Sequence, residues 1–195
     1  MEFMTKILTI LLSAVLVNNF VLTRFLGLCA FIGVSKKVEP SLGLGVAVVF
    51  VMGFSSLICS LIYNYVLVPL HIEYLRIIVF IIVIASYVQL VEIYTRKMVP
   101  SLYKALGVYL VLITTNCAVL YAVLYNVQEG YDVLNGTIYG IAGGIGFALA
   151  IVVLSYIRER LELSDVPEAL QGMPITFIVT GLMAIAFTGF TGLIK

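Results

Sequence analysis

The sequence predicts an all-α membrane protein with six transmembrane helices, and three observations lead to that prediction. Of 195 residues, 63% are apolar or aromatic and only 11% are charged, whereas a soluble domain carries about 25% charged residues. Four stretches contain no charged residue and no histidine: 40–70, 105–128, 133–157 and 169–194. Each exceeds the roughly 20 helical residues that cross a hydrocarbon layer. The stretches are continuously apolar rather than alternating, which argues against a transmembrane β-barrel.

The six predicted spans follow one another with short connections. They cover Ile7–Val34, Leu42–Val68, Tyr74–Thr95, Tyr103–Tyr125, Val133–Ile157 and Met173–Ile194. Together they form a single integral membrane domain over residues 1–195. This composition excludes a soluble enzyme, a nucleic-acid binder and a disulfide-stapled secreted domain.

The distribution of Lys and Arg predicts the orientation of these spans. The first, third and fifth loops hold seven basic residues, whereas the opposite side holds three. Basic residues favour the cytoplasmic side. We therefore expect the odd-numbered loops in the cytoplasm and both termini outside it. The seven are Lys36, Lys37, Arg96, Lys97, Lys104, Arg158 and Arg160, and the three are Lys6, Arg76 and Lys195.

An internal duplication divides the chain into repeats of about 1–97 and 98–195. A shift of 97 residues places Asn19 on Asn116 and Phe50 on Phe147. Each repeat has three spans, an odd number, so the second repeat is expected to be inverted relative to the first. Inverted repeats with broken helices are typical of membrane proteins with sites near the bilayer midplane.

The first span of each repeat is interrupted by polar residues at corresponding places. Asn18 and Asn19 interrupt the first span, and Thr114, Thr115 and Asn116 interrupt the fourth. A straight helix over residues 7–34 would measure about 42 Å, more than the hydrocarbon layer needs. We therefore expect both spans to be broken into half-helices. The alternative is that these polar side chains bond across helices in an intact bundle.

Two of the three cysteines lie in the interrupted spans. Cys117 directly follows the second break and Cys29 lies ten residues past Asn19, whereas Cys59 lies in an unbroken span. A membrane cysteine is usually a small packing residue, and we interpret Cys59 in that way. Cys29 and Cys117 are candidates for half of a four-thiolate iron–sulfur site, with a partner chain supplying the other two thiolates.

Arg24 is a further candidate because a cation within a span is costly and often functional. Two interpretations stay open: its charge offsets that of a buried redox centre, or its side chain reaches the interface.

Several segments resemble the RnfA/RnfE and NqrE/NqrD family of membrane subunits. The pair Asn18-Asn19 is typical of the RnfA branch rather than of NqrE. Ala30 and Val111 depart from the family pattern, which has proline in many members. The segments are residues 17–22 (VNNFVL), 25–29 (FLGLC), 33–37 (GVSKK), 112–120 (LITTNCAVL), 157–161 (IRERL), 165–167 (DVP) and 189–195 (GFTGLIK).

The resemblance implies a membrane component of the Rnf complex, an ion-translocating ferredoxin:NAD⁺ oxidoreductase of the prokaryotic inner (plasma) membrane. It implies a heterodimer with a homologous RnfE-like subunit of opposite topology, further Rnf subunits (B, C, D and G), and no nucleic acid. A [2Fe–2S] cluster between the two homologous subunits would take Cys29 and Cys117 from this chain, which is not catalytic alone. Electron relay would be coupled to Na⁺ or H⁺ transport. The alternatives are a redox-inactive inverted-repeat transporter or channel, a membrane scaffold subunit and the related NqrE subunit.

Overall fold

The computed structural model describes residues 15, 19–98, 112–113, 116–164, 166–167 and 170–189. Within these residues the regular structure is helical and no strand forms. This confirms the all-helical fold class for the described part of the chain. Asn18, Thr114 and Thr115, which the sequence analysis singled out, lie outside it.

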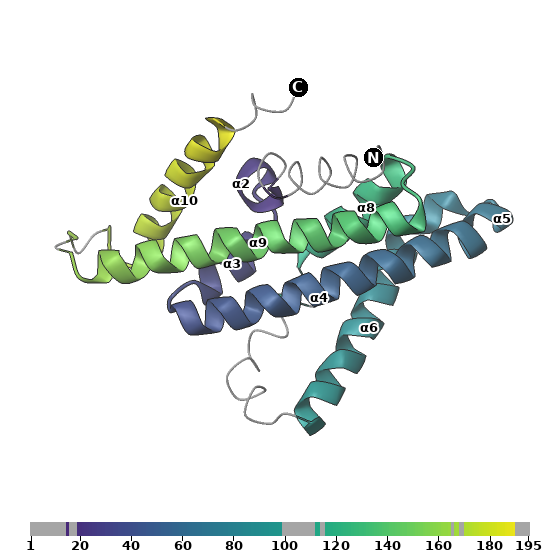
Figure 1. Ribbon diagram of the computed structural model, residues 1–195, viewed down its shortest axis with the longest axis horizontal. Helices are drawn as coiled ribbons and strands as arrows, with labels where there is room; N and C mark the ends of the chain where they lie inside the picture. Colours follow the sequence, from purple (N-terminus) through teal and green to yellow (C-terminus); the bar gives the residue numbers. More distant parts are fainter. Residues whose placement is uncertain are drawn as a thin grey trace, which may run out of the picture.

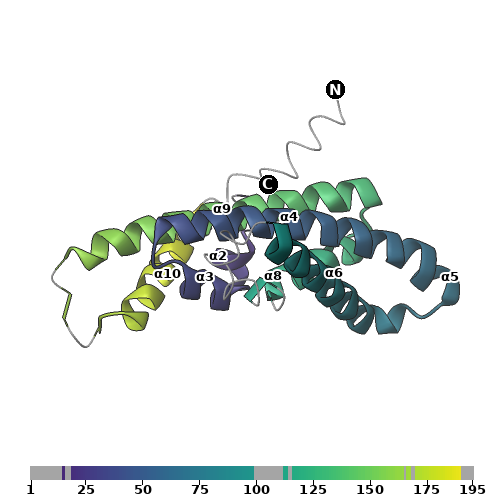
Figure 2. The ribbon, with the colours of Figure 1, turned by 90° about the horizontal axis from the view of Figure 1, so that it is seen from below.

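Two long helices, α4 (Val38–Ile62) and α9 (Val133–Glu162), form the centre of the molecule and lie side by side (Figures 1 and 2). They run antiparallel, because a Cβ added at Gly45, early in α4, would meet Ala148, whereas one added at Gly53 would meet Ile141. Close approach depends on small residues on both helices, as in other membrane helix pairs. The pair provides the support on which the shorter helices rest.

A change of helix type extends α4. Its C-terminal end continues through the π-helical turn η2 (Tyr63–Leu67) into the short α5 (Val68–Leu70). Pro69 explains the change, because a proline has no N–H to bond to the carbonyl one turn before it. A single π turn is the usual local adjustment inside an otherwise α-helical segment.

Three shorter helices lie on one side of the α4–α9 pair (Figure 2). They are α2 (Phe20–Arg24), α3 (Leu28–Val34) and α8 (Cys117–Gln128). The remaining helices are the turn η3 (Glu73–Leu75), α6 (Arg76–Met98) and α10 (Met173–Thr188). In Figure 1, α6 and α10 leave opposite ends of the long pair in opposite directions.

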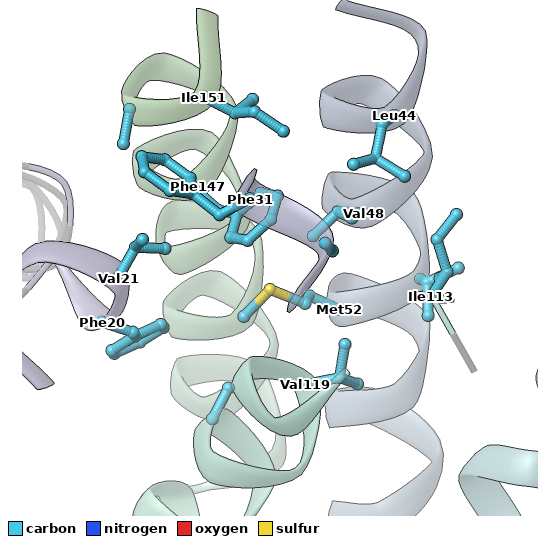
Figure 3. Packing of buried hydrophobic residues seen from close by; sticks show 14 of the residues in the cluster. Phe20, Val21, Phe31, Leu44, Val48, Met52, Ile113, Val119, Phe147 and Ile151 are labelled. Carbon is cyan, nitrogen blue, oxygen red and sulfur yellow. The ribbon is translucent and has the colours of Figure 1, made fainter. Parts of the chain in front are cut away.

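The buried core joins the short helices to the long pair. Phe31 of α3 packs edge-on against Phe147 of α9, with ring centroids 6.4 Å apart. Phe20 of α2 and Met52 of α4 lie in the same cluster, where Figure 3 shows them converging between the helices. Large side chains therefore pack α2 and α3 against the α4–α9 pair, in the close packing expected of an interior.

Three helical segments among the described residues are long and apolar enough to cross a membrane: Val38–Leu70, Glu73–Tyr94 and Val133–Glu162. They agree with the predicted second, third and fifth spans. Of two shorter apolar helices, Cys117–Gln128 overlaps the predicted fourth span and extends three residues beyond it, and Met173–Thr188 lies within the predicted sixth span. The chain is thus a multi-pass membrane protein. The outer face of α6 fits this environment, because Ile78 and Ile82 are more than half exposed there.

Candidate functional site at the broken helices

Two asparagines cap the helices that follow the interruptions. Asn19 precedes α2 in an extended conformation, and its Oδ1 accepts a hydrogen bond from the Val21 N–H at 3.2 Å. Asn116 precedes α8 in the same conformation, and its Oδ1 accepts from the Ala118 N–H at 3.0 Å. Asparagine is among the best N-cap residues because its side-chain oxygen satisfies an otherwise unpaired N–H. The two residues that the 97-residue shift aligns therefore have the same structural role.

A second interruption separates α2 from α3 and was not predicted from the sequence. Phe25 ends α2 with a φ of 55°, and Gly27 precedes α3 with a φ of 78°. Both angles lie in the left-handed region, which favours glycine and costs energy for Phe25. The segment has no polar side chain between Arg24 and Cys29 that would have indicated a break. Gly27 was the one residue in the sequence that indicated a break between α2 and α3, because glycine readily adopts a positive φ.

The two interrupted regions meet at Gly27 and Cys117. The Gly27 N–H donates a hydrogen bond to the Cys117 Sγ at 2.9 Å, across 90 residues of sequence. Any other residue type at Gly27 would require its neighbours to shift, because an added Cβ would lie 2.9 Å from the Asn116 Oδ1 and 3.2 Å from the Phe147 ring. Glycine thus allows both the left-handed turn and the close approach of the backbone to the thiol.

Cys29 lies two residues beyond Gly27, in the first turn of α3. Two residues of chain span at most about 7 Å, so the Cys29 backbone lies near the N–H that contacts Cys117. Cys29 and Cys117 are both exposed, whereas Cys59 is fully buried in α4. The structure therefore leaves two exposed thiols, whose backbones lie close to each other, and one thiol packed in the interior.

One backbone N–H and the N-terminal end of a helix lie at the Cys117 thiol. Cys117 is the first residue of α8, whose N-terminal end carries the positive end of the helix dipole. The buried Nδ2 of Asn116 has no hydrogen-bond partner among the described residues, whereas the Nδ2 of Asn19 donates to the Gly146 carbonyl at 2.8 Å. The Gly27 N–H and the N-terminal end of α8 thus place partial positive charge at the Cys117 Sγ.

The donor set fits half of a four-thiolate cluster. Among the described residues, no group of three or more His, Cys, Asp or Glu side chains could hold a metal ion. Two accessible thiols with a backbone N–H directed at one sulfur match what a [2Fe–2S] cluster would require from one of two contributing chains. The other two thiolates would have to come from a second chain.

Arg24 lies beside the helix that Cys117 begins. Its guanidinium carbon is 5.3 Å from the centroid of the Tyr121 ring, and Tyr121 is one helical turn beyond Cys117 on the same face of α8. Phe20 packs on the same ring at 5.2 Å. The spacing of Cys117, Tyr121 and Tyr125 at every fourth residue was a signal for this shared face that the sequence analysis did not use.

The chain is similar to known membrane proteins over nearly its whole length. A family model described as "Rnf-Nqr subunit, membrane protein" matches residues 7–194. The chain is 55% identical over 184 residues to the A subunit of the Na(+)-translocating ferredoxin:NAD(+) oxidoreductase complex of Acetobacterium woodii, covering 94% of this chain and 96% of the relative. It is 53% identical over 192 residues to the A subunit of the ion-translocating oxidoreductase complex of Syntrophotalea carbinolica, covering 98% and 99%. The corresponding subunit of Sodalis glossinidius is 50% identical, covering 98% and 100%.

Proposed function

The chain belongs to the Rnf-Nqr family of membrane subunits, and from that premise we propose that it is the A subunit of an ion-translocating ferredoxin:NAD⁺ oxidoreductase complex. In this proposal it holds half of an intramembrane [2Fe–2S] cluster through Cys29 and Cys117. The observation that carries the proposal is the hydrogen bond from the Gly27 N–H to the Cys117 Sγ. It joins the two interrupted regions at the Cys117 thiol, its donor Gly27 lies two residues along the chain from Cys29, and both thiols are exposed. Each relative above is named as the A subunit of an oxidoreductase complex.

The cluster would supply one-electron transfer within the membrane, and the residues of this chain would make its charge tolerable there. A thiolate-ligated cluster is anionic, and burying an anion in a low-dielectric medium is costly without compensation. The Gly27 N–H and the N-terminal end of α8 provide partial positive charge at the Cys117 Sγ. Hydrogen bonds to ligand sulfurs also tune reduction potential. Arg24, held over Tyr121, would add a full positive charge one turn away.

A homologous RnfE-like subunit would complete the site from the opposite side. The inverted-repeat arrangement is supported by the antiparallel α4 and α9 and by the matching caps at Asn19 and Asn116. Two chains built on this plan and inserted in opposite directions would present equivalent surfaces to each other. The B, C, D and G subunits would complete the complex in the prokaryotic plasma membrane.

Ion translocation would be the second half of this function. The Acetobacterium woodii relative is named as Na⁺-translocating, and we extend translocation of Na⁺ or H⁺ to this chain's complex. Reduction changes the charge held between the half-helices. A change of charge shifts the equilibrium between two conformations of the chain only if the charge interacts more favourably with one conformation than with the other. The short α2 and α3, joined by a turn, are the elements that such a change would move.

Alanine substitution of each cysteine tests the proposed ligands in the assembled complex. We expect Cys29→Ala and Cys117→Ala each to abolish the electron paramagnetic resonance signal of the shared cluster, with loss of its iron and acid-labile sulfide from the pair of homologous subunits. Cys59→Ala is the matched control, because Cys59 is buried in α4 and lies outside the proposed site. Its signal should be unchanged.

Two results would contradict the proposal. A full-strength signal in either Cys29→Ala or Cys117→Ala would remove that residue from the ligand set. Absence of iron and acid-labile sulfide from the wild-type pair would instead favour a redox-inactive transporter, channel or scaffold. Normal assembly of the variants, followed by purification of the complex, ensures that a lost signal reports a lost ligand.

A further inference from the structure

The half-helix that carries Cys29 is fastened at its other end to α9. The Nη1 of Arg158 donates hydrogen bonds to the Ile32 carbonyl at 2.9 Å and to the Ser35 Oγ at 2.8 Å. Arg158 lies more than 120 residues away in sequence, near the C-terminal end of α9. These bonds link the end of α3 to one of the two long helices at the centre of the molecule.

The Ile32 carbonyl has this partner because the backbone does not supply one. Carbonyls in the last turn of a helix lack intrahelical donors. The Lys36 N–H, which would continue the helical pattern to Ile32, bonds instead to the Val34 carbonyl at 2.8 Å. The Ser35 hydroxyl reaches the Ile32 carbonyl at 3.3 Å. The guanidinium therefore completes the end of the helix, and its positive charge complements the negative end of the helix dipole.

The next residue of α9 holds the other side of the same turn. The Glu159 Oε1 accepts a hydrogen bond from the Val38 N–H, the first of α4, at 3.1 Å. Ser155, one turn earlier in α9, shares a buried hydrogen bond with Ser41 of α4. A cation at the end of α3 and an anion at the start of α4 match the dipoles of both helices. Neighbouring residues of α9 thus fix the α3–α4 turn from both sides.

The two ends of α3 differ in how they are held. At the N-terminal end, where Cys29 lies, Gly27 provides no side-chain cap, and its backbone N–H bonds to the Cys117 Sγ. From Cys29 to Val34 the helix rises only about 7.5 Å, so α3 moves as a short rigid unit. A shift or rotation at the end bound by Arg158 is therefore transmitted directly to the Cys29 thiol.

We propose that Arg158 is a positioning residue, which fixes α3 through the Ile32 carbonyl and Ser35 and thereby sets the position of the Cys29 sulfur. Its effect on a redox centre rests on the proposed function, whereas its effect on α3 does not. Arg158 itself lies at the opposite end of α3 from the thiol and acts through the helix. A lysine keeps the charge, but it places a compact ammonium on a flexible stem instead of the planar guanidinium whose Nη1 reaches both acceptors.

Amide hydrogen exchange and magnetic resonance of the assembled complex test this role together. In Arg158→Gln we expect the exchange rates of the α3 amides to rise about tenfold, because a hydrogen bond to a charged group is lost. The cluster signal should persist but broaden with shifted g-values, since several positions of Cys29 replace one. Arg158→Lys should give an intermediate result. Arg160→Gln is the matched control, an exposed arginine on the same helix, and should resemble wild type.

Each outcome bears on the proposal. Wild-type exchange in α3 together with a wild-type spectrum in Arg158→Gln would overturn it. If that variant does not assemble, Ser35→Ala removes only the hydroxyl between Arg158 and the Ile32 carbonyl, and it should change exchange and spectrum in the same direction. No change in Ser35→Ala would then overturn the proposal. Faster exchange in α3, with a cluster signal that survives Cys29→Ala, would support the fastening of α3 and contradict only the ligand assignment.

Discussion

Gly27 combines two demands that no other residue type meets, and each makes a separate contribution to the site. Its φ of 78° is unfavourable for a residue with a Cβ, at a cost of about 1–2 kcal/mol. Its missing Cβ leaves room for the Asn116 Oδ1 and the Phe147 ring. The same residue donates its N–H to the Cys117 Sγ. Conformation, space and hydrogen bonding at the proposed site therefore meet in a single glycine.

Gly27→Ala is expected to disrupt the site more than its backbone strain alone explains. The added methyl would lie 2.9 Å from the Asn116 Oδ1, so either Gly27 or the N-cap of α8 must move and the N–H bond to Cys117 must lengthen. We expect loss or strong broadening of the cluster signal in the purified complex. Gly172→Ala is the control, because its φ is 86° but no described atom lies within 4 Å of an added Cβ. Equal effects of the two substitutions would show that strain alone is responsible.

At the residue scale, the sequence indicated the positions of two N-caps but not how distant residues contact one another. Asn19 and Asn116 were predicted from polarity within apolar runs, and both are N-caps. The bond between Gly27 and Cys117 could not be predicted, because a backbone N–H is common to nearly all residues and its partner lies 90 residues away. The contact of Arg158 with α3 was missed for a related reason: a charged residue at the end of a span is usually solvated.

The α4–α9 pair depends on backbone contact that only small residues allow. A Cβ at Gly144 of α9 would lie 2.7 Å from the Cα of Val49 in α4. Since a backbone atom cannot move aside as a flexible side chain does, the two helices would have to separate. The short helices α2, α3 and α8 pack on this pair, so separation of α4 from α9 would also alter the support of the proposed site.

Gly144→Ala should therefore lower the stability of the chain by about 1–3 kcal/mol, the usual cost of overpacking. The thermal unfolding midpoint of the complex in detergent measures the effect. Gly181→Ala is the matched control in α10, where no described atom lies within 4 Å of an added Cβ. There alanine should be neutral or slightly stabilising, because its helix propensity exceeds that of glycine. A midpoint for Gly144→Ala as high as that for Gly181→Ala would contradict tight backbone contact.

At the scale of elements, long helices were predictable and their interruptions only in part. Charge-free stretches predicted Leu42–Val68 and Val133–Ile157, a further apolar stretch predicted Tyr74–Thr95, and each agrees with a described helical segment. The break before α3 contains no polar residue, so hydropathy carried no signal for it. The π turn η2 contains one polar residue, Asn64, and Pro69 follows it closely, but the mean hydropathy of the span did not reveal the turn. Hydropathy reports burial in lipid, whereas breaks depend on local backbone angles.

At the scale of the whole molecule, the basic residues of the first and fifth loops lie at one end of the α4–α9 pair, together with the acidic Glu159 and Glu162. The turn holding Lys36 and Lys37 lies at the same end as the C-terminal end of α9, because Arg158 and Glu159 bind the residues that flank it. The opposite end includes the α8–α9 turn with Glu129 and without a basic residue. The structure thus places the first and fifth loops at the same end of the molecule. The predicted spans require this whichever way the chain is inserted, because odd-numbered loops share one side of the membrane. Which end faces the cytoplasm stays a prediction from the basic residues.

Labelling of single added cysteines in intact cells tests that orientation. We expect Glu129→Cys, in the turn between α8 and α9, to react with a membrane-impermeant maleimide added outside the inner membrane. Leu163→Cys, which follows α9 and is 89% exposed, should react only after the membrane is opened. The parent chain with its three native cysteines gives the background. We expect this labelling pattern because loops rich in Lys and Arg stay on the cytoplasmic side, since each basic residue resists transfer across the membrane during insertion. Labelling of Leu163→Cys but not Glu129→Cys from outside would reverse the orientation, and with it the side on which Arg158 fastens α3.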